Sequence, residues 1–208
     1  MGFINRKGEI VIPAKYEMEK YGSSYPSNGL IAVKNNNKFG FIDYHGNQVI
    51  EFKYDKVSDF EMEFSVIKLN NKFGLINKKS EYILAPIYDS LEYDAENMLC
   101  KIIDGKQFSK RKFGVFSIAK NKVIIEPKFD EIDFLETKYI RGKYIISNSP
   151  PVVYRYGLFN KDGVEILPPI YNKIEIIKDL IRMVYRYEGS IMDRQISYLN
   201  ANGVLIYE

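Results

Sequence analysis

The sequence predicts an all-β protein built as a tandem array of short hairpin repeats. Three observations support this fold class. One pattern of glycine, apolar residues and an aromatic–acid pair recurs along all 208 residues. The chain is rich in residues that favour strands, with 17 Tyr and 13 Phe. No long stretch shows the 3.6-residue apolar period of an amphipathic helix.

A glycine beside an aromatic residue marks each repeat. Full copies lie at 39–57, 73–91, 113–132 and 156–174, and further copies open and close the chain. The repeat glycines are Gly2, Gly40, Gly74, Gly114 and Gly157, with Ser197 in the sixth copy. Their spacings are 38, 34, 40, 43 and 40 residues, which predicts equivalent structural units arranged in series.

The first element of each repeat is an apolar strand at the glycine, as in 39–42. A polar turn follows, as at 44–46, where glycine supplies a positive φ. A second strand runs to an aromatic residue and contains proline in most copies, which predicts an edge strand or a strand end. A longer link leads to a third strand, such as 64–69. The pattern thus predicts about 16 short strands in three-stranded antiparallel units.

An aromatic–acid pair ends the second strand of each repeat. The aromatic residues are Tyr16, Tyr54, Tyr88, Phe129 and Tyr171. We expect their rings to be buried and to fill notches left by the repeat glycines, because each large aromatic buries ~150–250 Å². The residues that follow them are Glu17, Asp55, Asp89, Asp130 and Asn172. A carboxylate that recurs in this way is expected to cap a turn through backbone N–H groups, rather than to form one catalytic pair.

The repeat resembles the WG (KWG) β-repeat family of bacterial proteins. The matching positions are Lys38-Phe39-Gly40, Lys72-Phe73-Gly74, Lys112-Phe113-Gly114 and Arg155-Tyr156-Gly157, and the resemblance covers the whole chain. Phe or Tyr stands in each place of the family's signature Trp. The resemblance implies one WG-like β-repeat domain over 1–208, with repeats at roughly 1–34, 35–68, 69–106, 107–148, 149–187 and a partial repeat at 188–208.

Two arrangements of such repeats are open to the sequence. The repeats can close into a β-propeller, or they can form an open, solenoid-like array. The first and last repeats contribute the same hairpin, so the ends duplicate each other rather than complement each other. The open array is therefore favoured over the closed propeller.

The sequence indicates no catalytic, metal-binding or cofactor-binding residues. His45 is the only histidine and lies in a turn, and Cys100 is the only cysteine and lies in an apolar run. This excludes zinc sites made from several His or Cys ligands, and it excludes a disulfide within the chain. No phosphate-binding glycine loop is present. We therefore expect a protein that is not an enzyme and that needs no cofactor.

The net charge of +3 is too small to predict nucleic-acid binding, and no apolar run reaches the ~20 residues of a membrane-spanning helix. We expect neither a nucleic-acid partner nor membrane insertion. The N-terminus does not resemble a secretion signal, so the expected location is the cytoplasm.

Basic residues are concentrated in the second half of the chain. Residues 1–104 hold 13 basic and 15 acidic residues, whereas 105–208 hold 17 and 12. One cation precedes each aromatic–glycine pair, and in an array of repeats these residues are expected to line one edge free of acidic neighbours. The cations are Lys38, Lys72, Lys112 and Arg155, with Arg141 and Lys143 nearby and Tyr154 for cation–π contacts. Reversing Lys72 and Lys112 is expected to leave stability almost unchanged.

These features predict a non-catalytic scaffold for protein–protein interaction. The cationic edge favours an acidic protein partner, although such an edge can also serve only to prevent strand-to-strand aggregation. The alternative is a module that binds a carbohydrate or cell-wall polymer on exposed Tyr side chains.

Overall fold

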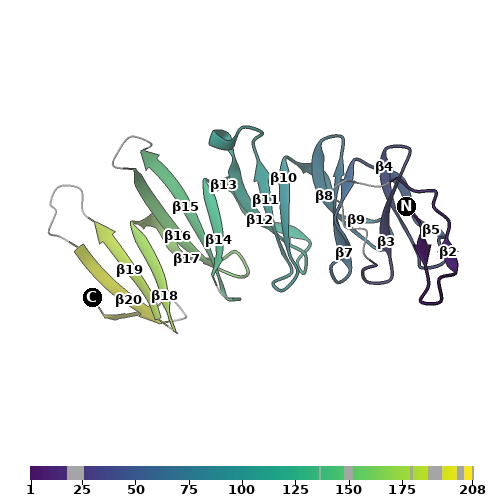
Figure 1. The fold of residues 1–208 in the computed structure, drawn as a ribbon. Coiled ribbons are helices and arrows are strands. Elements are labelled where there is room, and N and C mark those ends of the chain that lie inside the picture. Colours follow the sequence, from purple (N-terminus) through teal and green to yellow (C-terminus); the bar gives the residue numbers. More distant parts are fainter. Residues whose placement is uncertain are drawn as a thin grey trace. The chain divides into compact units, whose positions relative to one another are not determined.

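The computed structural model describes residues 1–17, 26–135, 137–147, 152–178, 180–186, 194–200 and 204–207 (Figure 1). The chain divides into two compact units, unit 1 (Met1–Cys100) and unit 2 (Lys101–Glu208), and each is described by itself.

Unit 1 contains a two-stranded, a three-stranded and a four-stranded sheet. Every strand pairs antiparallel with the strand that precedes it in its sheet. The strands are β1 (Phe3–Ile4) and β2 (Ile10–Ile12); β3 (Ile31–Asn35), β4 (Lys38–Ile42) and β5 (Gln48–Tyr54); and β6 (Lys56–Val57), β7 (Phe64–Leu69), β8 (Lys72–Asn77) and β9 (Tyr82–Tyr88).

Three further four-stranded sheets follow along the chain. The first has the order β10-β11-β12-β13, and the other two belong to unit 2. A single turn of 3-10 helix, η1 (Phe108–Lys110), lies between β11 and β12. The strands are β10 (Ser90–Asp94), β11 (Leu99–Asp104), β12 (Lys112–Ser117) and β13 (Lys122–Phe129); β14 (Glu131–Leu135), β15 (Tyr139–Ser147), β16 (Val153–Asn160) and β17 (Glu165–Tyr171); and β18 (Lys173–Ile177), β19 (Leu180–Arg186), β20 (Arg194–Asn200) and β21 (Leu205–Tyr207).

The predicted all-β tandem array is confirmed, because η1 is the only helical element of the described residues and none of the sheets closes into a barrel. The prediction of three strands per repeat is too low. A short strand begins two residues after the aromatic, and β6, β10, β14 and β18 each complete a four-stranded sheet. The residue after the aromatic is therefore the one residue that connects consecutive sheets, as Asp55 connects β5 to β6. A strand as short as Lys56–Val57 cannot show the apolar–polar alternation by which strands are predicted.

The hairpin turns are fixed by Asx residues that hydrogen-bond to the turn backbone. Asp43 Oδ1 accepts from the backbone N–H groups of His45 and Asn47, both at 2.8 Å, and Gly46 adopts the positive φ of 83° that the turn requires. The same side-chain acceptor recurs at Asn5, Asn77, Asn160 and Asn200. In the fourth repeat Ser117 stands at this position, and its Oγ accepts from Lys120 N at 3.3 Å.

The prolines lie in edge strands, as predicted. Pro86 is in β9, Pro127 is in β13, and Pro168 and Pro169 are in β17, and each of these strands is the last of its sheet. Proline has no N–H to donate, so these edges are poor templates for the addition of another strand.

The hydrophobic core lies between successive sheets. In unit 1, Phe41, Tyr54 and Phe60 belong to one cluster that joins the sheet of β3–β5 to that of β6–β9. In unit 2, Leu158 and Ile181 belong to a cluster that joins the sheet of β14–β17 to that of β18–β21, which lie side by side (Figure 1). Each sheet thus stabilises its neighbour, as in other repeat proteins.

The repeat aromatics are buried to different degrees. Tyr16, Tyr54 and Phe129 are buried as predicted, whereas Tyr88 and Tyr171 are half-buried. The repeat aromatic is therefore a buried core residue in the first, second and fourth repeats.

The prediction that these rings fill notches at the repeat glycines is wrong. A Cβ atom added at Gly74 would lie 2.6 Å from Leu84 O and 2.8 Å from Pro86 N, which are backbone atoms of β9. The cause is a register shift, because Phe73 pairs with Tyr88 but Leu75 pairs with Leu84, so that β9 bulges toward the glycine. The glycine therefore accommodates a neighbouring backbone rather than a ring.

An aromatic ring does fill a glycine notch at another position. A Cβ atom added at Gly142 in β15 would lie 2.5 Å from Cε1 of Phe129. The Phe129 ring also contacts Tyr144 and Phe159, with ring centroids 4.6 and 5.6 Å away. Phe129 thus joins the end of β13 to the next sheet, where β15 and β16 pair Gly142 with Gly157.

Candidate functional site

The predicted cationic edge is neutralised by the repeat carboxylates. Lys38 Nζ lies 2.6 Å from Asp55 Oδ1, and Lys72 Nζ lies 2.9 Å from Asp89 Oδ1. In unit 2, Lys112 Nζ lies 2.6 Å from Asp130 Oδ1. The expectation that these cations are free of acidic neighbours is therefore wrong.

The strand register explains these ion pairs. Phe39 pairs with Tyr54, so the residue before Phe39 and the residue after Tyr54 lie next to each other across the two antiparallel strands. The cation and the acid of one repeat are thus adjacent in space, although 17 residues separate Lys38 from Asp55. The sequence shows both the recurring cation and the recurring acid, but the pairing of one with the other depends on the bulged register.

The carboxylates also cap backbone N–H groups of the following sheet, as predicted. Glu17 Oε1 accepts from Asn37 N at 2.9 Å, and Asp130 Oδ2 accepts from Ile145 N at 2.8 Å. The hydrogen bond from Lys38 holds the pKa of Asp55 below its usual range. A carboxyl whose pKa is lowered by folding adds stability at neutral pH, and this stability is lost as the pH falls through the folded-state value.

Lys72→Glu is expected to lower the free energy of unfolding by about 1–2 kcal/mol, because it breaks a charge-assisted hydrogen bond and places two carboxylates together. Asp89 cannot turn fully to water, since its side chain is only 11% exposed. Urea unfolding followed by far-UV circular dichroism measures the effect, with Lys79→Glu as the exposed control. Equal stabilities of the two variants would show that the pair contributes nothing.

The other predicted binding residues are also engaged within unit 2. Arg141 Nη2 lies 2.7 Å from Asp133 Oδ2, and its Nη1 donates to Ile174 O at 3.2 Å. Lys143 forms an ion pair with Glu131, and its Nζ lies 5.0 Å from the centroid of Tyr154. Arg155 Nη1 donates to Tyr154 O at 3.1 Å. The acid position that matches Arg155 is occupied by Asn172, so the lysine–aspartate pair is replaced there.

The signature aromatics of the repeat lie beneath cations from the neighbouring strand. Lys34 Nζ is 5.6 Å from the Phe39 centroid, and Lys68 Nζ is 5.3 Å from the Phe73 centroid. Each lysine directly faces its aromatic across the ladder. A half-buried Phe can serve this cation–π role in place of Trp.

The hairpin between β11 and β12 departs from the repeat. In unit 1, Asn36-Asn37 and Asn70-Asn71 form the corresponding two-residue turns with positive φ values. Residues 105–111 replace such a turn with a loop that contains η1. Gly105 has a φ of 106°, and a Cβ atom there would lie 2.4 Å from Lys110 O, so only glycine fits at the neck of this loop.

Phe108 projects from this loop with 86% of its surface exposed. The Arg111 guanidinium carbon lies 5.4 Å from the ring centroid. Phe108 is a candidate contact residue because aromatic side chains and Arg are enriched at protein interfaces. The signal in the sequence was the Gly74–Gly114 spacing of 40 residues, compared with 34 in the preceding repeat.

A groove with a volume of about 780 Å³ runs beside Phe108 in unit 2. We call it the Phe108 groove. It brings together the loop, the start of β12, the start of β14 and part of β15. Its lining residues are Lys101, Phe108, Ser109, Arg111, Lys112, Phe113, Asp130, Glu131, Ile132, Asp133, Lys143 and Ile145. Of the residues predicted to bind a partner, the groove contains Lys112 and Lys143.

The chemistry of Cys100 and His45 offers no reactive centre. Cys100 is fully buried, and burial raises the pKa of its thiol to about 12, so it is protonated at neutral pH. His45 is exposed in its turn. Among the described residues, no group of three or more His, Cys, Asp or Glu could hold a metal ion. The described part of the chain also contains no helix long and apolar enough to span a membrane.

Comparison with solved structures gives distant similarities. They include a eukaryotic initiation factor (13% identity, TM-score 0.42, 86% of this chain and 51% of that chain). An uncharacterised protein from Listeria monocytogenes EGD-e gives 8% identity and a TM-score of 0.40, over 91% of this chain and 64% of that chain. A putative TolB from Agrobacterium tumefaciens gives 9% identity and a TM-score of 0.30, over 86% of this chain and 76% of that chain.

This chain spans about half the length of the initiation factor structure and less than two thirds of the Listeria protein. No curated protein matches the sequence.

The family comparison agrees with the repeat pattern. The model described as "WG containing repeat" matches residues 1–39, 39–73, 73–106, 116–139 and 156–182. These matches follow one another along most of the chain and include the ion pairs Lys38–Asp55 and Lys72–Asp89. The chain belongs to the WG containing repeat family.

Proposed function

We propose that the chain is a non-catalytic scaffold that binds a protein partner through the Phe108 groove. WG repeats and all-β repeat folds are typical of non-catalytic proteins. The observation that carries the proposal is the exposure of Phe108 beside a groove of about 780 Å³. Aromatic residues and Arg are enriched at protein interfaces, and here Arg111 stacks on Phe108.

The ion pairs of the repeats support this assignment of the site to the groove. Lys38, Lys72 and Lys112 are each paired with the aspartate of their own repeat, so these lysines couple the strands within it. A partner that bound these lysines would have to displace those pairs. The loop at 105–111 adds surface without interrupting the pairing of β12 with β13.

A carbohydrate or cell-wall polymer is the alternative ligand. Tyr44 and Tyr82 expose 48% and 46% of their surfaces in unit 1, and a tyrosine ring offers an apolar face with a polar tip. This alternative places the ligand away from the Phe108 groove and makes binding depend on these tyrosines.

Phe108→Ala is expected to weaken the binding of peptide ligands by about 30-fold, the loss typical of an interface hot spot. A displayed library of random peptides is selected on the immobilised wild-type protein, and the affinities of the selected peptides are then measured for both proteins. The control variant is Tyr82→Ala, which should bind these peptides normally.

Polysaccharide affinity electrophoresis provides the comparison for the alternative ligand. One outcome would favour a carbohydrate ligand over a protein partner. In it, a polysaccharide retards the wild type, Tyr44→Ala or Tyr82→Ala abolishes this retardation, and no peptide is selected. Selected peptides that bind Phe108→Ala as tightly as wild type would contradict the assignment of the groove.

A further inference from the structure

We infer that the Phe108 groove takes an acidic segment of a partner protein, in which carboxylates flank an apolar side chain. This inference rests on the proposed function and specifies the chemistry of the partner. It follows from which charges at the groove are already neutralised and from where its exposed apolar surface lies.

The three carboxylates of the groove are each engaged by a cation. Asp130 pairs with Lys112, Glu131 pairs with Lys143, and Asp133 pairs with Arg141. Asp130 also accepts the N–H of Ile145. These acidic groups are therefore satisfied internally, and they do not offer a site for a basic ligand.

The cations of the loop are placed differently. Lys106 and Lys110 are exposed, and Arg111 is half-buried against Phe108. Among the described residues, no carboxylate forms an ion pair with any of these three side chains. Asp104, at the base of the loop, uses Oδ1 to accept the N–H of Gly105. Arg111 lines the groove, and Lys106 and Lys110 belong to the same loop, so we take this loop as a positively charged rim that an anionic ligand can meet without breaking an existing pair.

The apolar part of the groove lies beside this rim. Phe108 is 86% exposed and Ile145 is 38% exposed, and both side chains line the groove. One aliphatic or aromatic side chain placed against them would remove this apolar surface from water, which favours binding. A ligand with carboxylates on either side of that side chain matches both features at once.

Three labelled peptides of equal length test the inference by fluorescence anisotropy. Each has a Gly-Ser backbone with one central Leu, flanked by Glu in the first, Lys in the second and Ser in the third. We expect the Glu peptide to bind about tenfold or more tightly than the Ser peptide, and the Lys peptide to bind most weakly. Raising NaCl from about 50 to about 300 mM should weaken only the Glu peptide, because salt screens exposed charges.

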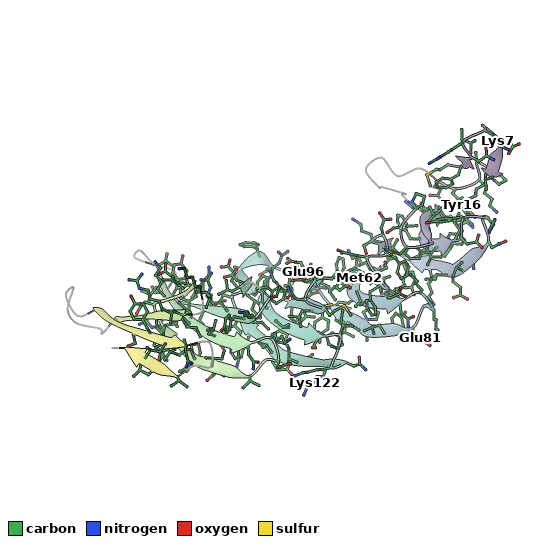
Figure 2. All side chains as sticks on the ribbon, turned by 90° about the horizontal axis from the view of Figure 1, so that it is seen from below. Lys7, Tyr16, Met62, Glu81, Glu96 and Lys122 are labelled. Atoms are coloured by element: carbon green, nitrogen blue, oxygen red, sulfur yellow. The ribbon has the colours of Figure 1, made fainter. Side chains whose placement is uncertain are left out.

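The double variant Lys110→Glu/Arg111→Glu should reverse the order and favour the Lys peptide. The matched control is Lys7→Glu/Lys79→Glu, which changes the net charge equally at exposed lysines of unit 1. Lys7 lies at the end of unit 1 (Figure 2). The control should bind like wild type, and similar circular dichroism spectra should show that both variants are folded.

The outcomes separate the inference from the proposed function. Binding that Phe108→Ala removes but that is indifferent to peptide charge overturns the acidic partner and keeps the scaffold. Failure of the wild type to bind any peptide, or binding unchanged in Phe108→Ala, overturns the scaffold site itself. Sedimentation of the wild type alone tests whether a second copy of this chain occupies the groove. Self-association that Arg111→Glu abolishes would overturn the acidic partner segment.

Discussion

Phe129→Ala is expected to lower the free energy of unfolding by about 3–5 kcal/mol, the range for removal of a buried Phe ring. The ring is completely buried, and it packs against the backbone at Gly142 and against Tyr144 and Phe159. Its loss leaves a cavity between the end of β13 and the sheet of β14–β17. Backbone atoms at Gly142 cannot move in to fill this cavity without disturbing the pairing of β15 with β16.

Urea unfolding followed by far-UV circular dichroism measures the Phe129→Ala effect. Phe108→Ala is the matched control, because it removes the same ring from a position that is 86% exposed, and its stability should lie within about 0.5 kcal/mol of wild type. A loss at Phe129 no larger than the loss at Phe108 would refute the view that this ring holds successive sheets together.

Gly114→Ala is expected to cost about 2–3 kcal/mol, whereas Gly157→Ala should cost less than about 1 kcal/mol. A Cβ atom at Gly114 would lie 2.5 Å from Ile125 O and 2.7 Å from Pro127 N, and these backbone atoms can shift only if β12 and β13 separate. At Gly157 the nearest atoms lie 3.2 Å away, so small movements suffice.

Both glycine variants lie in unit 2, which makes their comparison direct. Thermal and urea unfolding of the two proteins give the difference in stability. Alanine also restricts the unfolded chain, and this favours both variants by about 0.4–1 kcal/mol. Similar losses of stability at the two positions would mean that close approach of the bulged strand is not the reason for glycine at this position of the repeat.

The sequence was sufficient to predict three of the four strands in each four-stranded sheet, and their antiparallel order. Its repeat spacing located the hairpins, the prolines marked the edge strands β9, β13 and β17, and the recurring acids were recognised as caps. These features depend on local chemistry, because turn residues and proline act on the backbone within a few positions.

The parts that the sequence could not predict depend on register and on close approach. Lys72 and Asp89 are paired only because β9 bulges opposite Gly74, and a pattern of residue types does not show how two strands slide past each other. The ring of Phe129 was assigned to a repeat glycine, whereas it packs on Gly142, which the repeat does not mark.

The Phe108 groove was missed for the opposite reason. The repeat pattern predicts only positions that recur, and the loop at 105–111 departs from that pattern. Positive charge is in surplus after residue 104, and Lys106, Lys110 and Arg111 of the loop contribute to this surplus, whereas Lys38, Lys72 and Lys112 are paired with aspartates.

Methyl NMR with a selected peptide tests the central claim most directly. Protein labelled at isoleucine methyl groups is titrated with a peptide selected on the wild type. We expect chemical-shift changes of the methyl signals of Ile132 and Ile145, which line the Phe108 groove, and none for the exposed Ile10 and Ile87 of unit 1. Shifts confined to Ile10 or Ile87, with Ile132 and Ile145 unchanged, would contradict it.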